Sequence, residues 1–80
     1  GSIEILEKNI KFDIILANIS SNIIMKYSEL MKTKLEQNGI LICSGILAKD
    51  VDKTLRNLKN FGFKLESKII EDEWACMVLI

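Results

Sequence analysis

The sequence predicts a single α/β domain in which two strand–helix units are followed by two strands in succession. Short runs of consecutive apolar residues are typical of strands that are covered on both faces, as in a parallel sheet. Two longer segments carry apolar residues at spacings of three and four, which indicates helices with one buried side. The last two apolar stretches are separated by a polar turn that is too short for a crossover connection. A chain of 80 residues, 49% of them hydrophobic, has room for one small domain of this kind.

The first strand is predicted over residues 13–19, where apolar residues follow one another without alternation. The mixed segment 3–11 before it is compatible with either a short strand or a connecting segment. Gly1 and Ser2 are interpreted as a cloning scar. Residues 3–80 are therefore taken as one domain.

The first helix is predicted to begin after Ser20–Asn22, because all three of these residues are favourable N-caps. It is expected to extend for about four turns with a single apolar stripe. The stripe consists of Ile23, Tyr27, Leu30, Met31 and Leu35. Asn38 and Gly39 are expected to end the helix, with Gly39 in the left-handed cap position.

The second strand is predicted over residues 40–43, another consecutive apolar run, and Ser44–Gly45 is expected to end it. The second helix is expected to begin near Ala48 or Lys49, with acidic residues in its first turn, where the helix dipole favours them. Its apolar stripe is formed by Leu47, Val51, Leu55 and Leu58. Phe61–Gly62 is expected to close this helix.

The last two strands are predicted to pair as an antiparallel hairpin around the polar turn 71–73. Residues 63–69 alternate between apolar and polar side chains, which indicates a half-exposed strand at an edge of the sheet. Residues 74–80 are apolar throughout and suit a central position, and Trp74 is expected to anchor the core. If the strands are lettered a to d along the chain, the predicted order in the sheet is a-b-d-c, with the last strand antiparallel to the second.

The composition argues against several classes of protein. Eleven basic and eleven acidic side chains give a net charge of zero, which is not typical of a dedicated nucleic-acid binder. No apolar run approaches the roughly 20 residues of a membrane-spanning helix. The chain contains no His, so no His-bound metal and no imidazole base are expected. Cys43 and Cys76 lie in apolar runs and are interpreted as buried, reduced thiols of a cytoplasmic protein, without a metal site.

A ligand of such a sheet is expected beyond the carboxyl ends of its parallel strands, near the topological switch point. In this chain those ends are Ala17–Ile19 and Ser44–Ile46. The carboxamide of Asn18 can accept a hydrogen bond from a ligand. Alternatively, it can cap the following helix or satisfy a backbone group at the end of the strand. Ser44 and Gly45 can line the same cleft, or they can serve only as a flexible strand-to-helix turn.

The motifs at these strand ends resemble the C-terminal half of class I S-adenosylmethionine-dependent methyltransferases. Residues 12–19 are similar to the fourth-strand motif of that superfamily, which starts with an acid and ends in Asn. The ordered set Ala17-Asn18-Ile19, Ser44-Gly45-Ile46-Leu47 and Glu73-Trp74 resembles ribosomal protein methyltransferases of the PrmA type. The resemblance covers residues 12–80 and implies half of a Rossmann-like sheet.

The resemblance implies an S-adenosylmethionine-dependent enzyme that methylates nitrogen on large-subunit ribosomal protein eleven, in the cytoplasm. It implies that Asn18 orients the amine beside the methyl donor, and that Ala17, Asn18 and Ile19 contact S-adenosylmethionine. It also implies that Ser44 and Gly45 line the substrate cleft. No contact with nucleic acid, membrane or metal is expected.

The chain departs from the family pattern in what precedes its first strand. The Gly-rich loop that cradles the cofactor, the acidic residue that holds the ribose, and the N-terminal domain that recognises the ribosomal protein are all absent from the sequence. The chain is therefore interpreted as a C-terminal fragment that pairs with a missing N-terminal half, and the isolated chain is expected to be inactive.

A non-enzymatic alternative follows from the first strand. In the order a-b-d-c this strand lies at an edge, yet residues 14–17 are apolar and uncharged. Apolar edges of this kind normally require a partner. The alternative is a free-standing interaction domain that self-associates through this edge without catalysis.

Overall fold

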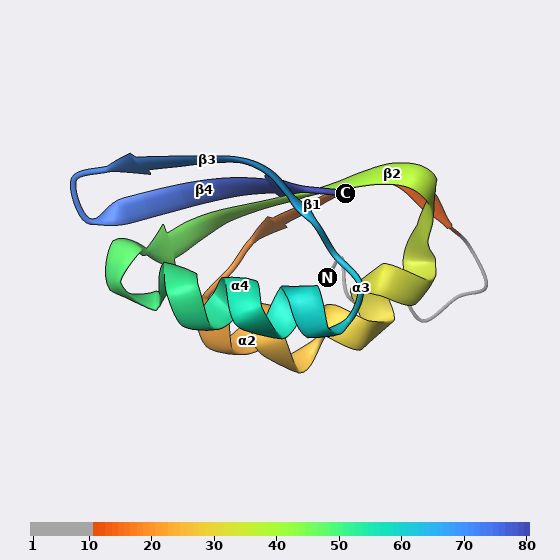
Figure 1. Cartoon of the computed structure of the whole chain (residues 1–80), viewed down its shortest axis with the longest axis horizontal. Helices are drawn as coiled ribbons and strands as arrows, with labels where there is room; N and C mark the ends of the chain where they lie inside the picture. The colour runs from red at the N-terminus through yellow and green to blue at the C-terminus, as the bar shows by residue number, and fades with distance from the viewer. Residues whose placement is uncertain (1–10) are drawn as a thin grey trace.

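The computed structural model describes residues 11–80, and the expectations for the cloning scar and for the segment 3–10 lie outside this range. Strands and helices follow one another as predicted, with two strands at the end (Figure 1). The elements are β1 (Phe12–Asn18), α2 (Ser21–Lys26), α3 (Ser28–Lys34), β2 (Leu35–Leu47), the 3-10 turn η1 (Ala48–Asp50), α4 (Val51–Asn60), β3 (Leu65–Glu71) and β4 (Trp74–Leu79).

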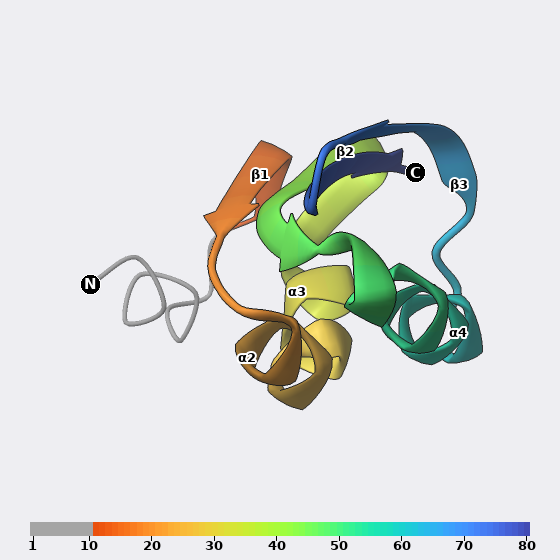
Figure 2. The same ribbon diagram turned by 90° about the vertical axis from the view of Figure 1, so that its left-hand side faces the viewer.

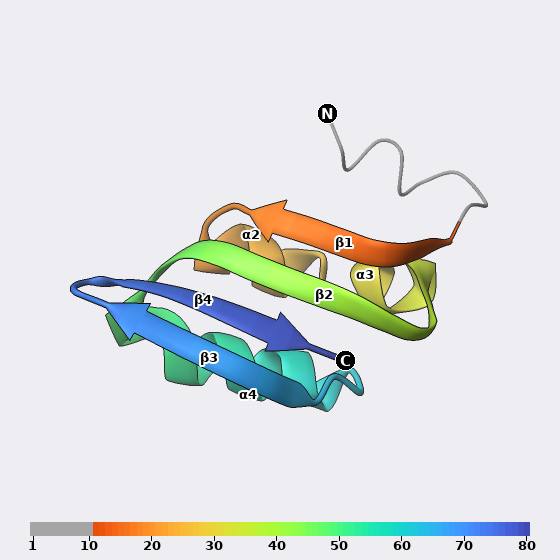
Figure 3. The same cartoon turned by 90° about the horizontal axis from the view of Figure 1, so that it is seen from above.

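The helices α2, α3 and α4 all lie on one face of the four-stranded sheet, as the end-on view shows (Figure 2). The strand order is β1-β2-β4-β3, which confirms the predicted order a-b-d-c. β1 is parallel to β2, whereas β4 is antiparallel to both of its neighbours, β2 and β3. Seen from above, the carboxyl ends of β1 and β2 and the β3–β4 turn lie at the same end of the sheet (Figure 3).

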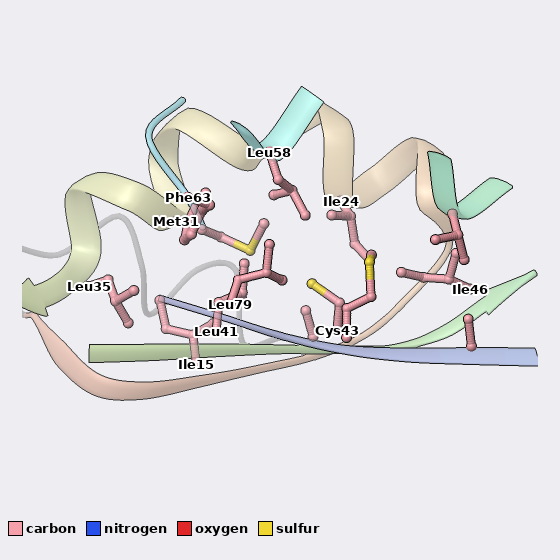
Figure 4. Packing of buried hydrophobic residues seen from close by; sticks show 14 residues of the cluster. Ile15, Ile24, Met31, Leu35, Leu41, Cys43, Ile46, Leu58, Phe63 and Leu79 are labelled. Atoms are coloured by element: carbon pink, nitrogen blue, oxygen red, sulfur yellow. The ribbon is translucent and has the colours of Figure 1, made fainter. Parts of the chain in front are cut away.

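The hydrophobic core fills the space between the sheet and the three helices (Figure 4). Leu41 at the centre of β2 is fully buried, and it is paired with Ile15 of β1 and Leu79 of β4. Ile24 and Leu58 close the core from the helical side. One layer of helices on one face of a sheet thus provides the buried apolar surface of this chain.

The opposite face of the sheet is open within residues 11–80, which corrects the expectation that the strands are covered on both faces. Ile14 and Leu16 of β1 are 54% and 70% exposed, while Ile15 and Ala17 between them are buried. The run is apolar throughout, but the pleat sends alternate side chains to opposite faces, and the described helices pack against only one of them.

The predicted first helix is in fact two short helices, α2 and α3, which are separated at Tyr27. Tyr27 has φ −105° and ψ 12°, outside helical geometry, although its N–H still donates to the Ile23 carbonyl at 3.1 Å. The chain leaves the helix earlier than predicted, because Leu35 is already the first residue of β2. The spacing of apolar residues alone could not show where the helix ends, since a buried Leu fits a helix and a strand equally well.

Asn38, rather than Gly39, takes the left-handed conformation, with φ +69°. Gly39 is needed for a different reason, since a Cβ there would lie 2.7 Å from Cγ of Leu35 and 2.8 Å from the Glu36 carbonyl oxygen. These residues produce an irregularity in the pairing of β1 with β2 rather than a helix cap.

The end of α4 confirms the predicted stop at Phe61–Gly62. Gly62 has φ +94°, its N–H donates to the Lys59 carbonyl at 3.0 Å, and the N–H of Phe63 donates to the Leu58 carbonyl at 3.1 Å. This pair of bonds is a Schellman motif, and the buried side chains of Leu58 and Phe63 supply the apolar contact that accompanies it.

Trp74 is not the core anchor that was predicted, because 52% of its surface is exposed. It begins β4, and because the next residue, Ala75, is buried, the pleat directs Trp74 to the open face of the sheet. The edge position of β3 is confirmed. All of its residues except Leu65 are exposed.

A polar seam joins the helices and was not foreseen. The hydroxyl of Ser21 on α2 is hydrogen-bonded to that of buried Thr54 on α4, and Thr54 donates to the Asp50 carbonyl at 2.7 Å. The hydroxyl of Ser28 on α3 lies 2.6 Å from Oδ1 of Asn57 on α4. Thr54 falls three residues after Val51 and four before Leu58, so helical spacing could have placed it on the buried side.

Replacing Thr54 with Val is expected to lower the free energy of unfolding by about 1–2 kcal/mol, because the buried Ser21 hydroxyl loses its partner. Thr33→Val is the matched control, since the Thr33 hydroxyl also donates to a helix carbonyl, that of Leu30 at 2.7 Å, but is exposed. Urea unfolding followed by circular dichroism measures both variants. If the two variants lose equal free energy of unfolding, the buried Ser21–Thr54 hydrogen bond contributes no more than the exposed hydroxyl of Thr33.

Candidate functional site

The structure brings the predicted site residues of β1 and β2 together. Asn18 ends β1 and is paired with Ser44 of β2, while the preceding pair is Ala17 with Cys43. Asn18 is exposed and Ser44 is half-buried. β1 ends at this pair, whereas β2 continues through Ser44–Gly45 to Leu47, so the predicted end of the second strand at Ser44–Gly45 is wrong. The parallel pairing of the two strands is what places residues 26 positions apart beside each other.

A bulge in β2 shapes this end of the sheet. Cys43 pairs with Met77, but the next pair is Ile46 with Ala75, so β2 holds one extra residue there. Gly45 lies in this bulge with φ +77°, a backbone conformation that residues other than glycine rarely adopt. The extra residue also explains why Cys43 and Ile46, three apart, are both buried in the same core.

The bulge places Gly45 directly against the side chain of Asn18. A Cβ at Gly45 would lie 2.6 Å from Oδ1 of Asn18, closer than real Cβ contacts allow. The carboxamide therefore occupies space that is available only because residue 45 has no side chain. Asn18 does not occupy the cap position of the following helix, since the N-cap residue of α2 is Ser20.

The two neighbours of Asn18 are placed differently. Ala17 is 6% exposed and its methyl group faces the core, so only its backbone is available to a ligand. Ile19 follows the strand and is partly buried against the core. Within the described part of the chain, both residues have a packing role in addition to any contact at the strand ends.

The cysteines do not supply a reactive group at this site. Burial, together with a smaller effect of the neighbouring Cys76, raises the pKa of the Cys43 thiol to about 12, so Cys43 is a neutral core residue at ordinary pH. Cys76 is half-buried and pairs with Ile69, which places it toward the open face. In residues 11–80, no cluster of three or more His, Cys, Asp or Glu side chains is arranged to hold a metal.

A second feature of the same end was missed by sequence reasoning. An open hollow of about 390 Å³ is lined by Leu47, Ala48, Lys49 and Glu73. The N–H of Ala48 donates to the Glu73 carbonyl at 2.8 Å, so β2 and the β3–β4 turn are joined there. Only the folded hairpin brings these residues together, and no spacing in the sequence indicates the hollow.

None of the described helices is long and apolar enough to span a membrane.

The sequence model of the family "Ribosomal protein L11 methyltransferase (PrmA)" matches residues 2–80. The chain belongs to this family. It is 35% identical over 68 residues to a ribosomal protein L11 methyltransferase of Lactococcus lactis subsp. cremoris, which covers 85% of the chain and 22% of that protein. It is 37% identical over 70 residues to that of Dictyoglomus turgidum, covering 88% of the chain and 23% of the relative.

The fold agrees with this membership of the L11 methyltransferase family. The crystal structure of a ribosomal protein L11 methylase from Lactobacillus delbrueckii subsp. bulgaricus superposes with a TM-score of 0.86 and 26% identity, over 90% of this chain and 38% of that one. The predicted family resemblance and the α/β fold are thereby confirmed. The chain spans less than a quarter of the length of the curated relatives, at 22% and 23%.

Proposed function

We propose that this chain forms one part of the active site of an S-adenosylmethionine-dependent N-methyltransferase that acts on ribosomal protein L11. The observation that carries the proposal is the position of Asn18. Its carboxamide is exposed at the end of β1, beside Ser44 and Gly45 of β2, where ligands of parallel sheets bind. Family membership supports the reaction class. A ribosomal substrate would place the protein in the cytoplasm.

The proposed role of Asn18 follows from the needs of methyl transfer. When bound, S-adenosylmethionine supplies an electrophilic methyl group on a sulfonium sulfur. A neutral amine of the substrate must then point its lone pair at the methyl carbon, in line with the bond that breaks. The Asn18 oxygen can accept a hydrogen bond from the N–H of that amine and so fix its orientation. No acid or base from the chain is required at that step.

The residues around Asn18 fit the remaining roles. The backbone of Ala17 and Ile19, on either side of Asn18, is proposed to contact the methyl donor. Ser44 and Gly45, beside Asn18 in β2, are proposed to border the space on the substrate side. Gly45 leaves this border open because it carries no side chain. The Gly-rich loop of the family is absent from the sequence, so we expect weak or no binding of S-adenosylmethionine by the 80 residues alone.

The proposal is tested in a grafted enzyme, in which the matching segment of the Lactococcus lactis relative is replaced by the corresponding residues of this chain. We expect the grafted enzyme to transfer a labelled methyl group to ribosomal protein L11. A folded graft that binds S-adenosylmethionine but transfers nothing would contradict the proposal. Calorimetry on the 80 residues tests the fragment interpretation, which micromolar binding of the methyl donor would overturn.

A second candidate function is self-association without catalysis. The observation that favours it is the exposure of Ile14 and Leu16, 54% and 70%, on a strand whose outer edge has no neighbour among the described strands. A second copy could extend the sheet at this edge or cover its open face.

Leu16→Lys tests this candidate. If β1 mediates a dimer, the substitution is expected to weaken the dimer by about tenfold or more, because a buried Leu contributes about 1.5–3 kcal/mol. Ile23→Lys on α2, a residue 41% exposed, is the control that leaves β1 intact. Sedimentation equilibrium over a range of concentrations measures both. A stable monomer at high concentration would exclude this function for the chain.

A further inference from the structure

We propose that Gly45 is a positioning residue for Asn18, and that the bulge in β2 exists at this point to hold the Asn18 carboxamide at the strand ends. The geometric part of this inference stands on the structure of the chain. Its consequence for methyl transfer rests on the function proposed above. Gly45 borders the substrate side in the proposed function but touches no reacting atom, and the effect inferred here is its effect on the position of the Asn18 carboxamide.

The first step is the location of the bulge. The extra residue of β2 falls between the pairs Cys43–Met77 and Ile46–Ala75, which is the level at which β1 ends. Asn18 is the last residue of β1 and pairs with Ser44, immediately before Gly45. Bulges of this kind change the direction of a strand and of its side chains, and they are frequent beside functional sites.

The second step is the contact itself. Of the atoms near a Cβ built at Gly45, only Oδ1 of Asn18 is too close, at 2.6 Å, while the Cγ and backbone C atoms of Asn18 are both at 3.8 Å. A methyl group at position 45 would therefore clash with the carboxamide oxygen of Asn18 and with no other neighbouring atom. Because the Asn18 side chain is exposed, it can relieve the clash by rotating away. The expected effect is a displaced oxygen rather than an unfolded protein.

The third step separates this contact from the backbone requirement. Gly62 also has a positive φ, of +94°, but a Cβ there meets only Cε of Lys32, at an acceptable 3.4 Å. Both glycines adopt a left-handed backbone conformation. Only at Gly45 would a Cβ also clash with a residue of the candidate site, Asn18. Gly62→Ala thus carries the backbone strain of Gly45→Ala without its effect on Asn18.

A displacement of the Asn18 oxygen by about 1 Å is expected to lower kcat for methyl transfer by about a hundredfold, because the amine loses its alignment. KM for the methyl donor should change little. The loss should disappear in an Asn18→Ala background, where no carboxamide remains to be displaced. A purely structural glycine would give additive losses instead.

The deciding experiment is nuclear magnetic resonance on the 80-residue chain. The three-bond coupling between Cγ and the backbone nitrogen of Asn18 reports its χ1 angle. We expect Gly45→Ala to change this coupling, Gly62→Ala to leave it unchanged, and both variants to lower the folding equilibrium constant by a similar factor of about five. An unchanged Asn18 coupling in Gly45→Ala would overturn the inference while leaving the proposed function intact.

The functional consequence is measured in the grafted enzyme. Gly45→Ala is expected to lower kcat, Gly62→Ala to preserve it at temperatures where the enzyme stays folded, and Asn18→Ala/Gly45→Ala to be no slower than Asn18→Ala. Additive losses in the double variant would overturn the positioning role. If Asn18→Ala has no effect on its own, the function proposed for Asn18 fails, and the coupling measurement still decides the geometric inference.

Discussion

Replacing Leu41 with Ala is expected to lower the free energy of unfolding by about 3 kcal/mol. Leu41 is 0% exposed at the centre of β2, between its paired residues Ile15 and Leu79. The substitution removes buried apolar surface and leaves a cavity that two strands and the overlying helices cannot close. Because a domain of this size is stable by only a few kcal/mol, we expect the variant to be largely unfolded at 25 °C.

The control for this prediction is Leu16→Ala, in the neighbouring strand. Leu16 has the same side chain and also lies in a strand, but it is 70% exposed, so its loss is expected to cost less than about 1 kcal/mol. Urea unfolding at low protein concentration, followed by circular dichroism, gives both values and avoids any self-association. A Leu41→Ala variant as stable as Leu16→Ala would show that the core does not lie where the structure has it.

Replacing Asn18 with Ala in the grafted enzyme is expected to lower kcat for methyl transfer by about a hundredfold. The carboxamide oxygen is proposed to orient the incoming amine, and this contact matters most when the nitrogen approaches the methyl carbon. KM for S-adenosylmethionine should rise much less, since the backbone of Ala17 and Ile19 is unchanged. Initial rates with a labelled methyl donor separate the two parameters.

Two further variants test the interpretation of that loss. Asn22→Ala removes the same side chain from an exposed position on α2, four residues away, and is expected to leave kcat unchanged. Asn18→Gln keeps the carboxamide but moves it outward by one methylene group, so an intermediate loss is expected. If Asn18→Ala raises KM and leaves kcat unchanged, the residue binds a ligand without orienting the reaction.

Most of the fold could be predicted from local patterns. The run 13–19, the helical spacing of apolar residues over 47–58 and the polar turn 71–73 each indicate one element. The structure has β1, α4 and the β3–β4 hairpin at these places, although α4 begins at Val51 rather than near Ala48 or Lys49, which lie in the 3-10 turn η1. The strand order followed because a short turn permits only an antiparallel pair, and an apolar strand suits the centre of a sheet better than an alternating one. Asn18 and Ser44 could be placed together because both were expected at the carboxyl ends of neighbouring parallel strands, although β2 in fact continues to Leu47.

Other features depended on contacts between distant segments. A Leu at helical spacing also fits a buried strand, so the early end of α3 and the start of β2 at Leu35 were decided by packing. Trp74 is apolar in sequence, but its position in the pleat directs it to the face that carries no described helix. The hydroxyl pair of Ser21 and Thr54 joins residues that are 33 positions apart.

The amino-acid sequence of this protein determined its elements, their order in the sheet and the pair of strand ends that meet, because these depend on hydrophobic period, turn length and the direction of parallel strands. The tertiary structure alone decided which face of the sheet is buried and why Gly45 stands beside Asn18. The first depends on the face against which the described helices pack. The second depends on the register between strands, where one extra residue in β2 changes the direction of the side chains that follow.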